Sequence, residues 1–414
     1  MSGERIVIVG SGQAAIQLAA SLRQEGHEGP IPLIGDEPGL PYQRPPLSKG
    51  YMKEGDPERL VLKPQSFFER TAITLRDATR VASIDRAART VATDDGASHG
   101  YDHLVLATGA RNVRPPIAGG THSDVVELRT LAHAADIRDR MLRAKRAVVV
   151  GGGFIGLEFA AMAEAAGVAT TVVEAAPRLM ARAVSPAISE RFKAFHRAAG
   201  TEILLDAPAA RIVAPAAGAA DRVVLADGSE ILGDLVMVAT GVKPNVELAE
   251  AAGLAVLNGI TVDEALSTGD AAISAIGDCA SVTGPLGIHL RLESVQAATD
   301  QARHLARRLV TGHREAYHAV PWFWSDQGSL KLQIAGLSQG ADHFHSLGEE
   351  AVDTVFGFRA GALVSVETVN QPGQHMAARK LLASDAPVLR EAIEAVGFDL
   401  KALAKGQASA RAAE

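Results

Sequence analysis

Cysteine and long apolar runs are the two features that this sequence most clearly lacks. Its 414 residues include one cysteine, Cys279, and no apolar run reaches the roughly 18–20 residues that a membrane-spanning helix needs. A single thiol forms neither an internal disulfide nor a metal cluster, and it is typical of a reducing compartment. The first residues, MSGER, lead into an expected strand without an apolar leader. We therefore expect a cytoplasmic protein that has no membrane partner.

Excess positive charge and aromatic side chains are scarce as well. The 41 Lys and Arg residues are outnumbered by 48 Asp and Glu, and the net charge of −7 argues against a nucleic-acid partner. The 13 histidines show no ligand spacing, so no metal site is expected. Aromatic residues make up 4% of the chain and hydrophobic residues 47%, a composition that favours α/β domains with helices packed closely on sheets. The length indicates two or three domains.

A glycine-rich turn follows the first apolar run, in IVIVGSGQAAIQLAA. We expect a strand over 6–9 and a helix over 13–24, with the turn between them. Gly10 permits the tight turn, Gly12 lets the backbone approach a pyrophosphate, and Ala15 allows the helix to pack closely on the strand. The N-terminus of the helix offers N–H groups and the positive end of the helix dipole. The pattern therefore predicts a dinucleotide site.

The same pattern occurs a second time, in AVVVGGGFIGLEFA, where Gly151, Gly153 and Gly156 repeat the spacing. Each turn is followed much later in the chain by its own apolar run ending in Ala-Thr-Gly, LVLATGA over 104–110 and LVMVATGV over 235–242. Two similar nucleotide-binding domains are therefore expected. The residues of these later runs that we place at strand ends near the nucleotides are Thr108, Gly109 and Gly241.

An acidic residue ends the strand that follows each turn. Asp36 and Glu37 follow IPLIG, and ATTVVE ends at Glu174. A carboxylate at this place accepts hydrogen bonds from ribose hydroxyls and repels a 2′-phosphate, so Glu174 favours NADH over NADPH. Arg178 and Arg182 follow closely, and arginines can instead hold a 2′-phosphate. The strictness of the preference for NADH therefore stays open.

Proline-bearing segments mark the expected domain boundaries, because RNVRPP and GVKPN each follow an Ala-Thr-Gly run and AVPWFW precedes a segment of mixed strands and helices. The predicted fold class is α/β, with two Rossmann-like domains, one inserted in the other, and a C-terminal α+β domain. We expect residues 1–110 and 246–319 to form the first domain, 111–245 the inserted one, and 320–414 the third.

Two nucleotides in one chain indicate an electron relay, in which a flavin accepts a hydride from a nicotinamide and releases electrons singly.

Taken together, these motifs resemble those of the FAD-dependent NADH:ferredoxin reductases of the putidaredoxin reductase-like kind. The likeness runs from residue 6 to at least 370 and includes LPYQRPPLSK, GVKPN, AIGDCA, RLESVQAA and PWFWSDQ. It implies a glutathione reductase-like fold and the cofactors FAD and NADH. It also implies that a [2Fe–2S] ferredoxin is reduced and feeds a cytochrome P-450 class monooxygenase or a Rieske dioxygenase. Rubredoxin reductases and the apoptosis-inducing factor group share many of these motifs.

The resemblance also implies roles for single residues. Lys49 lies near the flavin in this family and pairs with the glutamate of the GLE motif, here Glu158, which we also place at the NADH site. Phe154 occupies the position of an aromatic residue that covers the flavin until nicotinamide arrives. A helix that begins within 291–298 points at the flavin pyrimidine and stabilises negative charge there. The residues that match FAD contacts are Asp36, Arg44, Lys49, Asp278, Ser294, Val295 and Trp324.

Three further features qualify this interpretation. The redox cysteines that disulfide reductases and NADH peroxidases of this fold carry are absent, so Cys279 is expected to be a small packed residue and electrons to leave from the flavin. Within 301–314, a stretch with four arginines and no acid, Arg303 and Arg307 are predicted to dock an acidic ferredoxin, the alternative being a solvated helix face. For Trp324 the alternative is packing at a domain seam.

The alternative functions are those of a rubredoxin reductase, a flavin NADH oxidase and an apoptosis-inducing-factor-like redox sensor.

Overall fold

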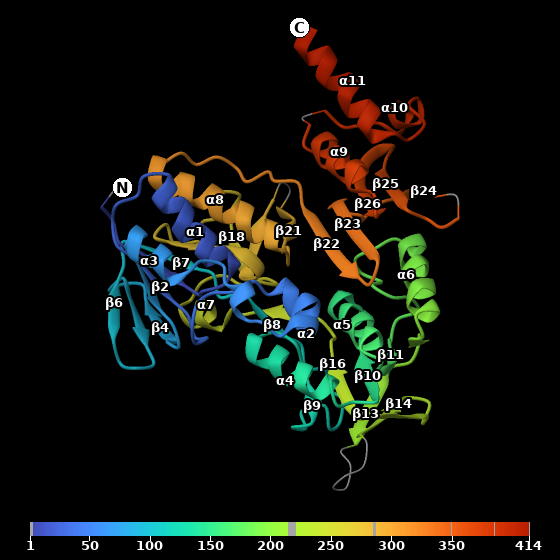
Figure 1. Ribbon diagram of the computed structural model, residues 1–414. Helices are drawn as coiled ribbons and strands as arrows, with labels where there is room; N and C mark the ends of the chain where they lie inside the picture. The colour runs from blue at the N-terminus through green and yellow to red at the C-terminus, as the bar shows by residue number, and fades with distance from the viewer. Residues whose placement is uncertain (1–2, 214–220, 285–286, 349, 385, 414) are drawn as a thin grey trace. The chain divides into compact units, whose positions relative to one another are not determined.

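The computed structural model describes residues 3–213, 221–284, 287–348, 350–384 and 386–413 (Figure 1). The contacts within the chain divide it into two units. Unit 1 comprises Met1–Arg44, Asp56–Arg111 and Val242–Ala319. Unit 2 comprises Pro45–Gly55, Asn112–Gly241 and Val320–Glu414. Each unit therefore brings together segments that are far apart in the sequence, as expected when one nucleotide domain is inserted in another.

Unit 1 is built on a parallel sheet with the strand order β19-β7-β1-β2-β3. Its strands are β1 (Ile6–Val9), β2 (Ile31–Ile34), β3 (Ile73–Arg76), β7 (His103–Leu106) and β19 (Ile273–Ala275). Every side chain of β1 and β7 is buried, which is typical of parallel strands. Two helices, α1 (Gln13–Gln24) and α8 (Val295–Thr311), pack side by side (Figure 1). The strand and helix expected at 6–9 and 13–24 are thereby confirmed.

Smaller elements complete unit 1. An antiparallel sheet consists of β4 (Val81–Asp85), β5 (Thr90–Thr93) and β6 (Ser98–Gly100), and a mixed one consists of β18 (Ile260–Val262), β20 (Ala280–Thr283) and β21 (His289–Leu290). The short helices are η2 (Glu58–Leu60), α3 (Gln65–Thr71), α7 (Glu247–Ala251) and η3 (Gly277–Cys279). The chain leaves unit 1 through β8 (Ala110–Asn112) and re-enters it at β17 (Val242–Pro244).

Unit 2 contains a second parallel sheet, with the order β12-β11-β10-β16-β9. Its strands are β9 (Val125–Val126), β10 (Arg146–Val150), β11 (Ala169–Val173), β12 (Glu202–Leu204) and β16 (Leu235–Val238). An antiparallel sheet of β13 (Ala209–Val213), β14 (Asp221–Leu225) and β15 (Glu230–Gly233) precedes β16, just as β4, β5 and β6 precede β7. Four strands follow the same order in the two sheets, β7-β1-β2-β3 and β16-β10-β11-β12, which confirms the internal repeat expected from the sequence. The fifth strand differs, since β19 comes last in the chain among its sheet's strands and β9 comes first.

The helices of this part of unit 2 are η1 (Pro45–Ser48), α2 (Gly50–Glu54), α4 (Leu131–Met141), α5 (Phe154–Ala165) and α6 (Pro186–Ala198). Thr130 and Ser185 cap α4 and α6, since each side-chain oxygen accepts a hydrogen bond from a backbone N–H of the first turn. The short segment Pro45–Gly55 belongs to unit 2 by its contacts, although it follows the first parallel strands in the chain.

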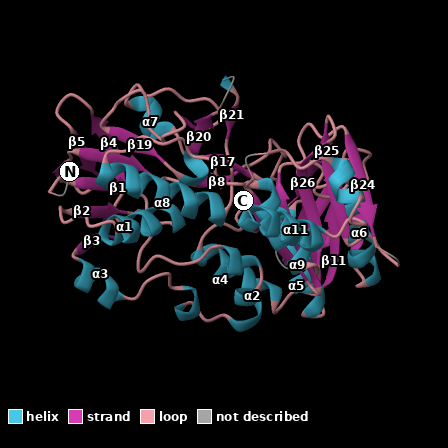
Figure 2. Cartoon of the chain, turned by 90° about the horizontal axis from the view of Figure 1, so that it is seen from above, coloured by secondary structure: helices cyan, strands magenta, loops and turns pink. Residues whose placement is uncertain are grey.

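The remainder of unit 2 is an antiparallel sheet with the order β22-β23-β26-β25-β24. Its strands are β22 (Trp322–Gln327), β23 (Leu330–Gly336), β24 (His343–Leu347), β25 (Thr354–Arg359) and β26 (Ala362–Val369). The helices are α9 (Pro372–Leu382), α10 (Arg390–Glu394) and α11 (Leu400–Ala413). α9 packs against β23 and β26, and α11 packs against α9 (Figure 2). This part is the expected α+β fold, and the predicted fold class is confirmed. The predicted domain boundaries remain predictions.

No helix in the described ranges combines the length and the apolar character required to cross a bilayer.

Candidate functional site

The first glycine turn joins β1 to α1 and lies against the first Ala-Thr-Gly run. β1 pairs in parallel with β7, so that the carbonyl oxygen of Ala107 reaches Gly10, where a Cβ would overlap it. Gly10 also has φ of +114°, which favours glycine. Among the described residues, no atom lies within 4 Å of a Cβ built on Gly12, which is the N-cap of α1 and brings no side-chain acceptor to its first turn. The turn therefore fits a pyrophosphate at a helix N-terminus.

The second turn repeats this geometry between β10 and α5. Gly151 has φ of +113°, and a Cβ there would overlap the carbonyl oxygen of Ala239, in the second Ala-Thr-Gly run. Gly153 is the N-cap of α5 with open space around it, and a Cβ on Gly156 would overlap the backbone of the turn. In contrast with the capped helices α4 and α6, both α1 and α5 begin on an open glycine. Two dinucleotide sites are thus built into one chain.

The acids after the two turns have different surroundings. Asp36 is exposed and lies 3.5 Å from the Arg80 guanidinium, whereas the Glu37 carboxylate accepts hydrogen bonds from the Tyr42 hydroxyl and from Arg44. Burial lowers the pKa of the Arg44 guanidinium, but the Glu37 carboxylate, together with Tyr42 and Asp278, raises it by more, so the net shift is upward. The structure therefore brings Arg44 to Glu37 rather than to Asp36, and the ribose contact of Asp36 stays a prediction.

Glu174 is held by the turn that precedes it. Its Oε2 accepts a hydrogen bond from the backbone N–H of Gly152 at 2.6 Å, and Oε1 accepts one from Ala176 at 2.8 Å. Arg178 donates to the carbonyl oxygens of Ala181 and Val184, so its guanidinium is engaged by the backbone. The carboxylate is thus fixed beside the open turn, and its contact with a ribose stays a prediction.

An ion pair in unit 2 joins the segment after η1 to α5. Lys49 Nζ lies 2.9 Å from Glu158 Oε1, and Glu158 is only 4% exposed. The Ser48 hydroxyl donates to Oε2 at 2.5 Å, and the Ser325 hydroxyl donates to Oε1 at 2.6 Å. A buried carboxylate needs a counter-charge and hydrogen-bond donors, and Glu158 has both. The pair that the resemblance implied is therefore present, whereas the two serines were not anticipated.

Phe154 lies on the same side of α5, one turn before Glu158. Its ring centroid is 4.6 Å from that of Phe323, and Glu158 meets Ser325 two residues further along β22. Four residues of a helix and two of a strand cover similar lengths, about 6 Å and 6.6 Å, so α5 and β22 stay in register over these contacts. Trp324 alternates to the opposite side of β22, and the structure does not bring it to the ion pair.

The remaining predicted FAD residues lie at strand and helix ends of unit 1. Asp278 is in η3, and the Arg291 guanidinium donates to its carbonyl oxygen at 3.3 Å. Ser294 is the N-cap of α8, where its hydroxyl accepts from the N–H of Ala297, and Val295 is the first helical residue. The helix start expected within 291–298 is thus observed. The thiol of Cys279 is fully buried, and burial raises its pKa, so it is packed and unreactive as expected.

The two Ala-Thr-Gly runs end in similar hydrogen bonds. The Thr108 hydroxyl donates to the carbonyl oxygen of Asn245 at 2.7 Å, and the Thr240 hydroxyl donates to that of Val113 at 3.0 Å. The glycines that follow, Gly109 and Gly241, both have positive φ, +66° and +105°. These contacts hold each strand end beside its glycine turn, which is a structural task, and nucleotide contacts there stay predictions.

The arginine-rich stretch is only partly a surface. Arg303 and Arg307 are exposed on α8, as predicted, and Arg303 lies 3.7 Å from Asp300. Arg308 instead points into unit 1, where its guanidinium donates to the carbonyl oxygen of Ala265 and to the hydroxyls of Ser267 and Ser274. The basic surface of this helix is therefore smaller than the run of four arginines indicated, because successive residues of a helix face different directions.

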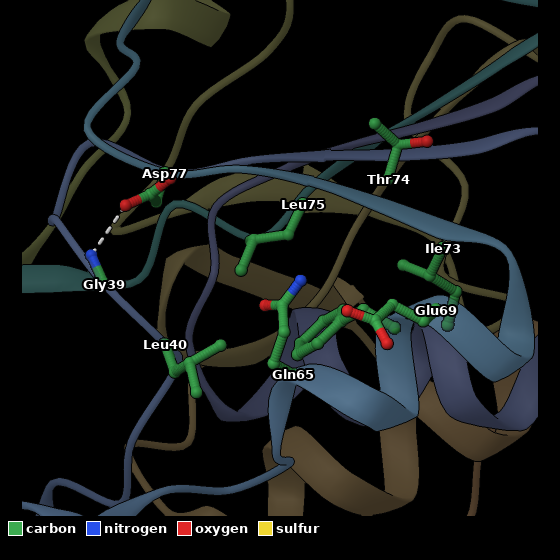
Figure 3. Close-up of a pocket in the computed structure, with 9 residues that line it drawn as sticks. Gly39, Leu40, Gln65, Glu69, Ile73, Thr74, Leu75 and Asp77 are labelled. Atoms are coloured by element: carbon green, nitrogen blue, oxygen red, sulfur yellow. Dashed lines mark hydrogen bonds between the residues drawn. The ribbon is translucent and has the colours of Figure 1, made fainter.

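A further hollow of about 450 Å³ lies at the edge of unit 1 beside β3 and α3 (Figure 3). Gly39 donates its N–H to Asp77 at 2.7 Å on one side of it, and Leu40 and Leu75 line it with Gln65 and other residues of α3. None of the predicted nucleotide-binding residues lines this hollow, and we assign no cofactor to it.

Residues 4–302 match the family model described as pyridine nucleotide-disulphide oxidoreductase, and residues 322–404 match one described as reductase C-terminal. Rhodocoxin reductase from Rhodococcus erythropolis is 48% identical over 401 residues, 96% of this chain and 93% of that protein. The ferredoxin reductase for the CYP199A2 system from Rhodopseudomonas palustris superimposes with a TM-score of 0.92 at 46% identity, over 97% of this chain and 100% of that one. The covalent putidaredoxin reductase–putidaredoxin complex gives a TM-score of 0.92 at 35% identity, over 98% and 99%.

Proposed function

This chain belongs to the pyridine nucleotide-disulphide oxidoreductase family, and we propose that it is an NADH-dependent ferredoxin reductase with FAD as its bound cofactor. It takes a hydride from NADH and delivers electrons one at a time to a [2Fe–2S] ferredoxin. That ferredoxin supplies a cytochrome P-450 class monooxygenase or a Rieske dioxygenase. The similarity to rhodocoxin reductase and to the reductase bound to putidaredoxin supports this class of partner.

The observation that carries the proposal is the pair of open glycine turns in a chain whose one thiol is buried. Both α1 and α5 begin on a glycine with room for a pyrophosphate, so two dinucleotides fit. Cys279 has no second cysteine to pair with and is inaccessible, so electrons do not pass through a dithiol. When bound, FAD accepts a hydride, which carries two electrons, and can release these two electrons singly to an external acceptor.

The first turn and its surroundings would hold FAD. Gly10, Gly12 and Ala15 admit the pyrophosphate and let α1 pack closely behind it. The N-terminus of α8, at Ser294 and Val295, would place backbone N–H groups and a positive dipole end at the flavin pyrimidine. We assign the remaining FAD contacts by resemblance to Asp36, Arg44, Lys49, Thr108, Gly109, Asp278 and Trp324.

The second turn would hold NADH. Gly151, Gly153 and Gly156 admit its pyrophosphate, and Glu174 would accept hydrogen bonds from the ribose hydroxyls. The end of the second Ala-Thr-Gly run, at Gly241, would lie against the same nucleotide. A negative charge at Glu174 disfavours the 2′-phosphate of NADPH. Arg178, which could otherwise hold that phosphate, donates hydrogen bonds to the backbone carbonyl oxygens of Ala181 and Val184.

The Lys49–Glu158 pair and Phe154 would serve the hydride transfer. A cation held near the flavin favours its reduced, negatively charged form, and the buried carboxylate of Glu158 keeps the Lys49 ammonium in one place. Phe154 would cover the flavin face until the nicotinamide replaces it. The exposed guanidinium groups of Arg303 and Arg307 would meet the acidic surface of the ferredoxin in a transient complex.

We also place the enzyme in the cytoplasm, where one unpaired thiol such as Cys279 stays reduced.

The experiment that tests the proposal is NADH-driven reduction of cytochrome c by the purified holoenzyme, with and without a [2Fe–2S] ferredoxin. A large ferredoxin-dependent rate is expected. A rate that ignores the ferredoxin while oxygen is consumed would contradict the proposal in favour of an NADH oxidase. A preference for a mononuclear iron acceptor would indicate a rubredoxin reductase, and slow turnover with dimerisation on NADH addition would indicate a redox sensor.

A further inference from the structure

Glu158 is the first member of a buried hydrogen-bond chain that continues well beyond the ion pair. Ser325 Oγ lies 2.6 Å from Glu158 Oε1, and Gln327 Nε2 lies 3.2 Å from Ser325 Oγ. Gln327 Oε1 in turn lies 2.8 Å from His196 Nε2, on α6. Glu158 is nearly buried and the other three side chains are fully buried, so water does not replace these contacts.

The direction of every hydrogen bond follows from the carboxylate. An ionised carboxylate only accepts, so the Ser325 hydroxyl donates to it and must itself accept from the amide N–H of Gln327. The amide oxygen of Gln327 then accepts from His196, which fixes the proton of the imidazole on Nε2. Burial lowers the pKa of His196, in agreement with a neutral ring. All dipoles of the chain therefore point their positive ends at Glu158.

An amide in the middle of the chain excludes one role. The Gln327 amide cannot accept and release a proton as a hydroxyl or an imidazole can, so this chain of hydrogen bonds does not conduct protons. It can orient and stabilise a charge, because each donor is polarised by the next. We propose that Ser325, Gln327 and His196 are positioning residues that lock the Glu158 carboxylate toward Lys49, and so set the rate of hydride transfer and the potential of the flavin.

The elements packed on α5 support this assignment. The charged group that faces Glu158 directly is Lys49, and the titratable group at the far end of the chain is His196. β10 and β11 bring mainly Val, Ala and Thr side chains to α5, and Arg146, at the start of β10, lies 3.7 Å from Asp234 instead. The orientation of Glu158 is therefore set by Lys49, Ser48 and the chain that starts at Ser325.

This inference rests on the proposed function, since it deepens the role of the Lys49–Glu158 pair. The test compares Ser325→Ala and Gln327→Leu with a matched control, Ser365→Ala. Ser365 is equally buried in the same antiparallel sheet, and its hydroxyl has no hydrogen-bond partner in the described part of the chain. The readouts are the limiting rate of flavin reduction by NADH, the apparent Kd for NADH, and the midpoint potential of the bound flavin by equilibrium titration.

Ser325→Ala is expected to lower the limiting rate of flavin reduction about ten-fold, because one hydrogen bond to a charged group is lost. It should also lower the midpoint potential of the flavin and leave the Kd for NADH unchanged. Gln327→Leu should lower the limiting rate and the midpoint potential as well, but by smaller amounts than Ser325→Ala. Ser365→Ala should match the wild type in both. In a Glu158→Gln background, Ser325→Ala should have no further effect, because the chain acts through the carboxylate.

The inference is overturned if Ser325→Ala matches Ser365→Ala, or if it lowers the rate as much in the Glu158→Gln background as in the wild type. Failure of the proposed function looks different. If NADH reduces the wild-type flavin quickly but no electrons reach a ferredoxin, the proposed function is contradicted. The role of the hydrogen-bond chain can still be tested in that case, because its readouts need only NADH and the flavin.

Discussion

The carbonyl oxygen of Ala239 occupies the space that a Cβ on Gly151 would need, so the second glycine turn and the second Ala-Thr-Gly run interlock. Gly151→Ala should therefore destabilise the protein by about 2 kcal/mol or more, since it adds a clash to a positive φ, and should also raise the KM for NADH. Thermal unfolding and steady-state kinetics measure the two effects.

Gly153→Ala is the matched comparison for this prediction. Its backbone has φ of −82° and its Cβ would meet no atom of the described residues, so the loss of stability should be limited to the poorer N-cap that alanine makes, well below that of Gly151→Ala. The KM for NADH should still rise, because the methyl group would lie where the pyrophosphate approaches. A normal KM in Gly153→Ala would remove the nucleotide from this turn.

The charge of Glu174 should set the choice between the two nicotinamide cofactors. Glu174→Gln keeps an oxygen that can accept from Gly152 but removes the charge, so the ratio of kcat/KM for NADPH to that for NADH should rise about ten-fold, equivalent to about 1.4 kcal/mol. Glu202→Gln, an exposed glutamate on β12, is the control and should leave the ratio unchanged. An unaltered ratio in Glu174→Gln would show that another group excludes NADPH.

Charge reversal on α8 should weaken ferredoxin binding alone. The double variant Arg303→Glu/Arg307→Glu should raise the apparent KM for ferredoxin, with the larger effect at low ionic strength, while flavin reduction by NADH stays normal. Arg211→Glu/Arg222→Glu carries the same charge change on exposed positions of β13 and β14 and serves as control. Equal ferredoxin kinetics in both double variants would assign docking to another surface.

His103 should make the stability of the protein depend on pH on the acid side. Burial, together with the nearby Arg308 charge, lowers the pKa of His103 from 6.5 to about 3. The unfolded chain therefore binds a proton between these values that the folded chain refuses, so the free energy of unfolding falls as the pH drops below about 6.5.

His103→Gln should reduce that acid-side fall, because glutamine can keep a hydrogen bond to Ser274 and does not titrate. Urea unfolding at several pH values between 5 and 8 measures the slope. His313→Gln, at an exposed position, should leave it unchanged. Identical slopes in the two variants would locate the proton uptake at other groups.

The parts of the fold that were predictable from sequence are those with a local cause. The apolar run before Gly10 and the glycine spacing after it determine β1 and α1, and the same pattern determines β10 and α5. The pairing of Lys49 with Glu158 was inferred by resemblance, since the two residues are far apart in the chain and nothing in their spacing joins them.

The parts that were not predictable depend on tertiary packing. Arg307 and Arg308 are neighbours in the chain, yet one is exposed and the other reaches Ser267 and Ser274 in the core, a choice that only the packing of α8 decides. His196 and Gln327 belong to segments that meet only when the antiparallel sheet packs on α6. Glu37 directly follows Asp36 in the sequence, and its bonds to Tyr42 and Arg44 depend on the course of the loop that follows.

The burial of Cys279 makes the native protein a convenient carrier for site-specific labels. Its thiol is enclosed in unit 1 and reluctant to ionise, so a maleimide probe should ignore it under native conditions. A single new thiol introduced by Thr311→Cys, at the exposed end of α8 and one turn beyond Arg307, would then be the only cysteine to react, and it would leave both predicted docking arginines in place. A fluorophore or spin label attached there would report the arrival and departure of the ferredoxin in real time, without any background from the rest of the chain.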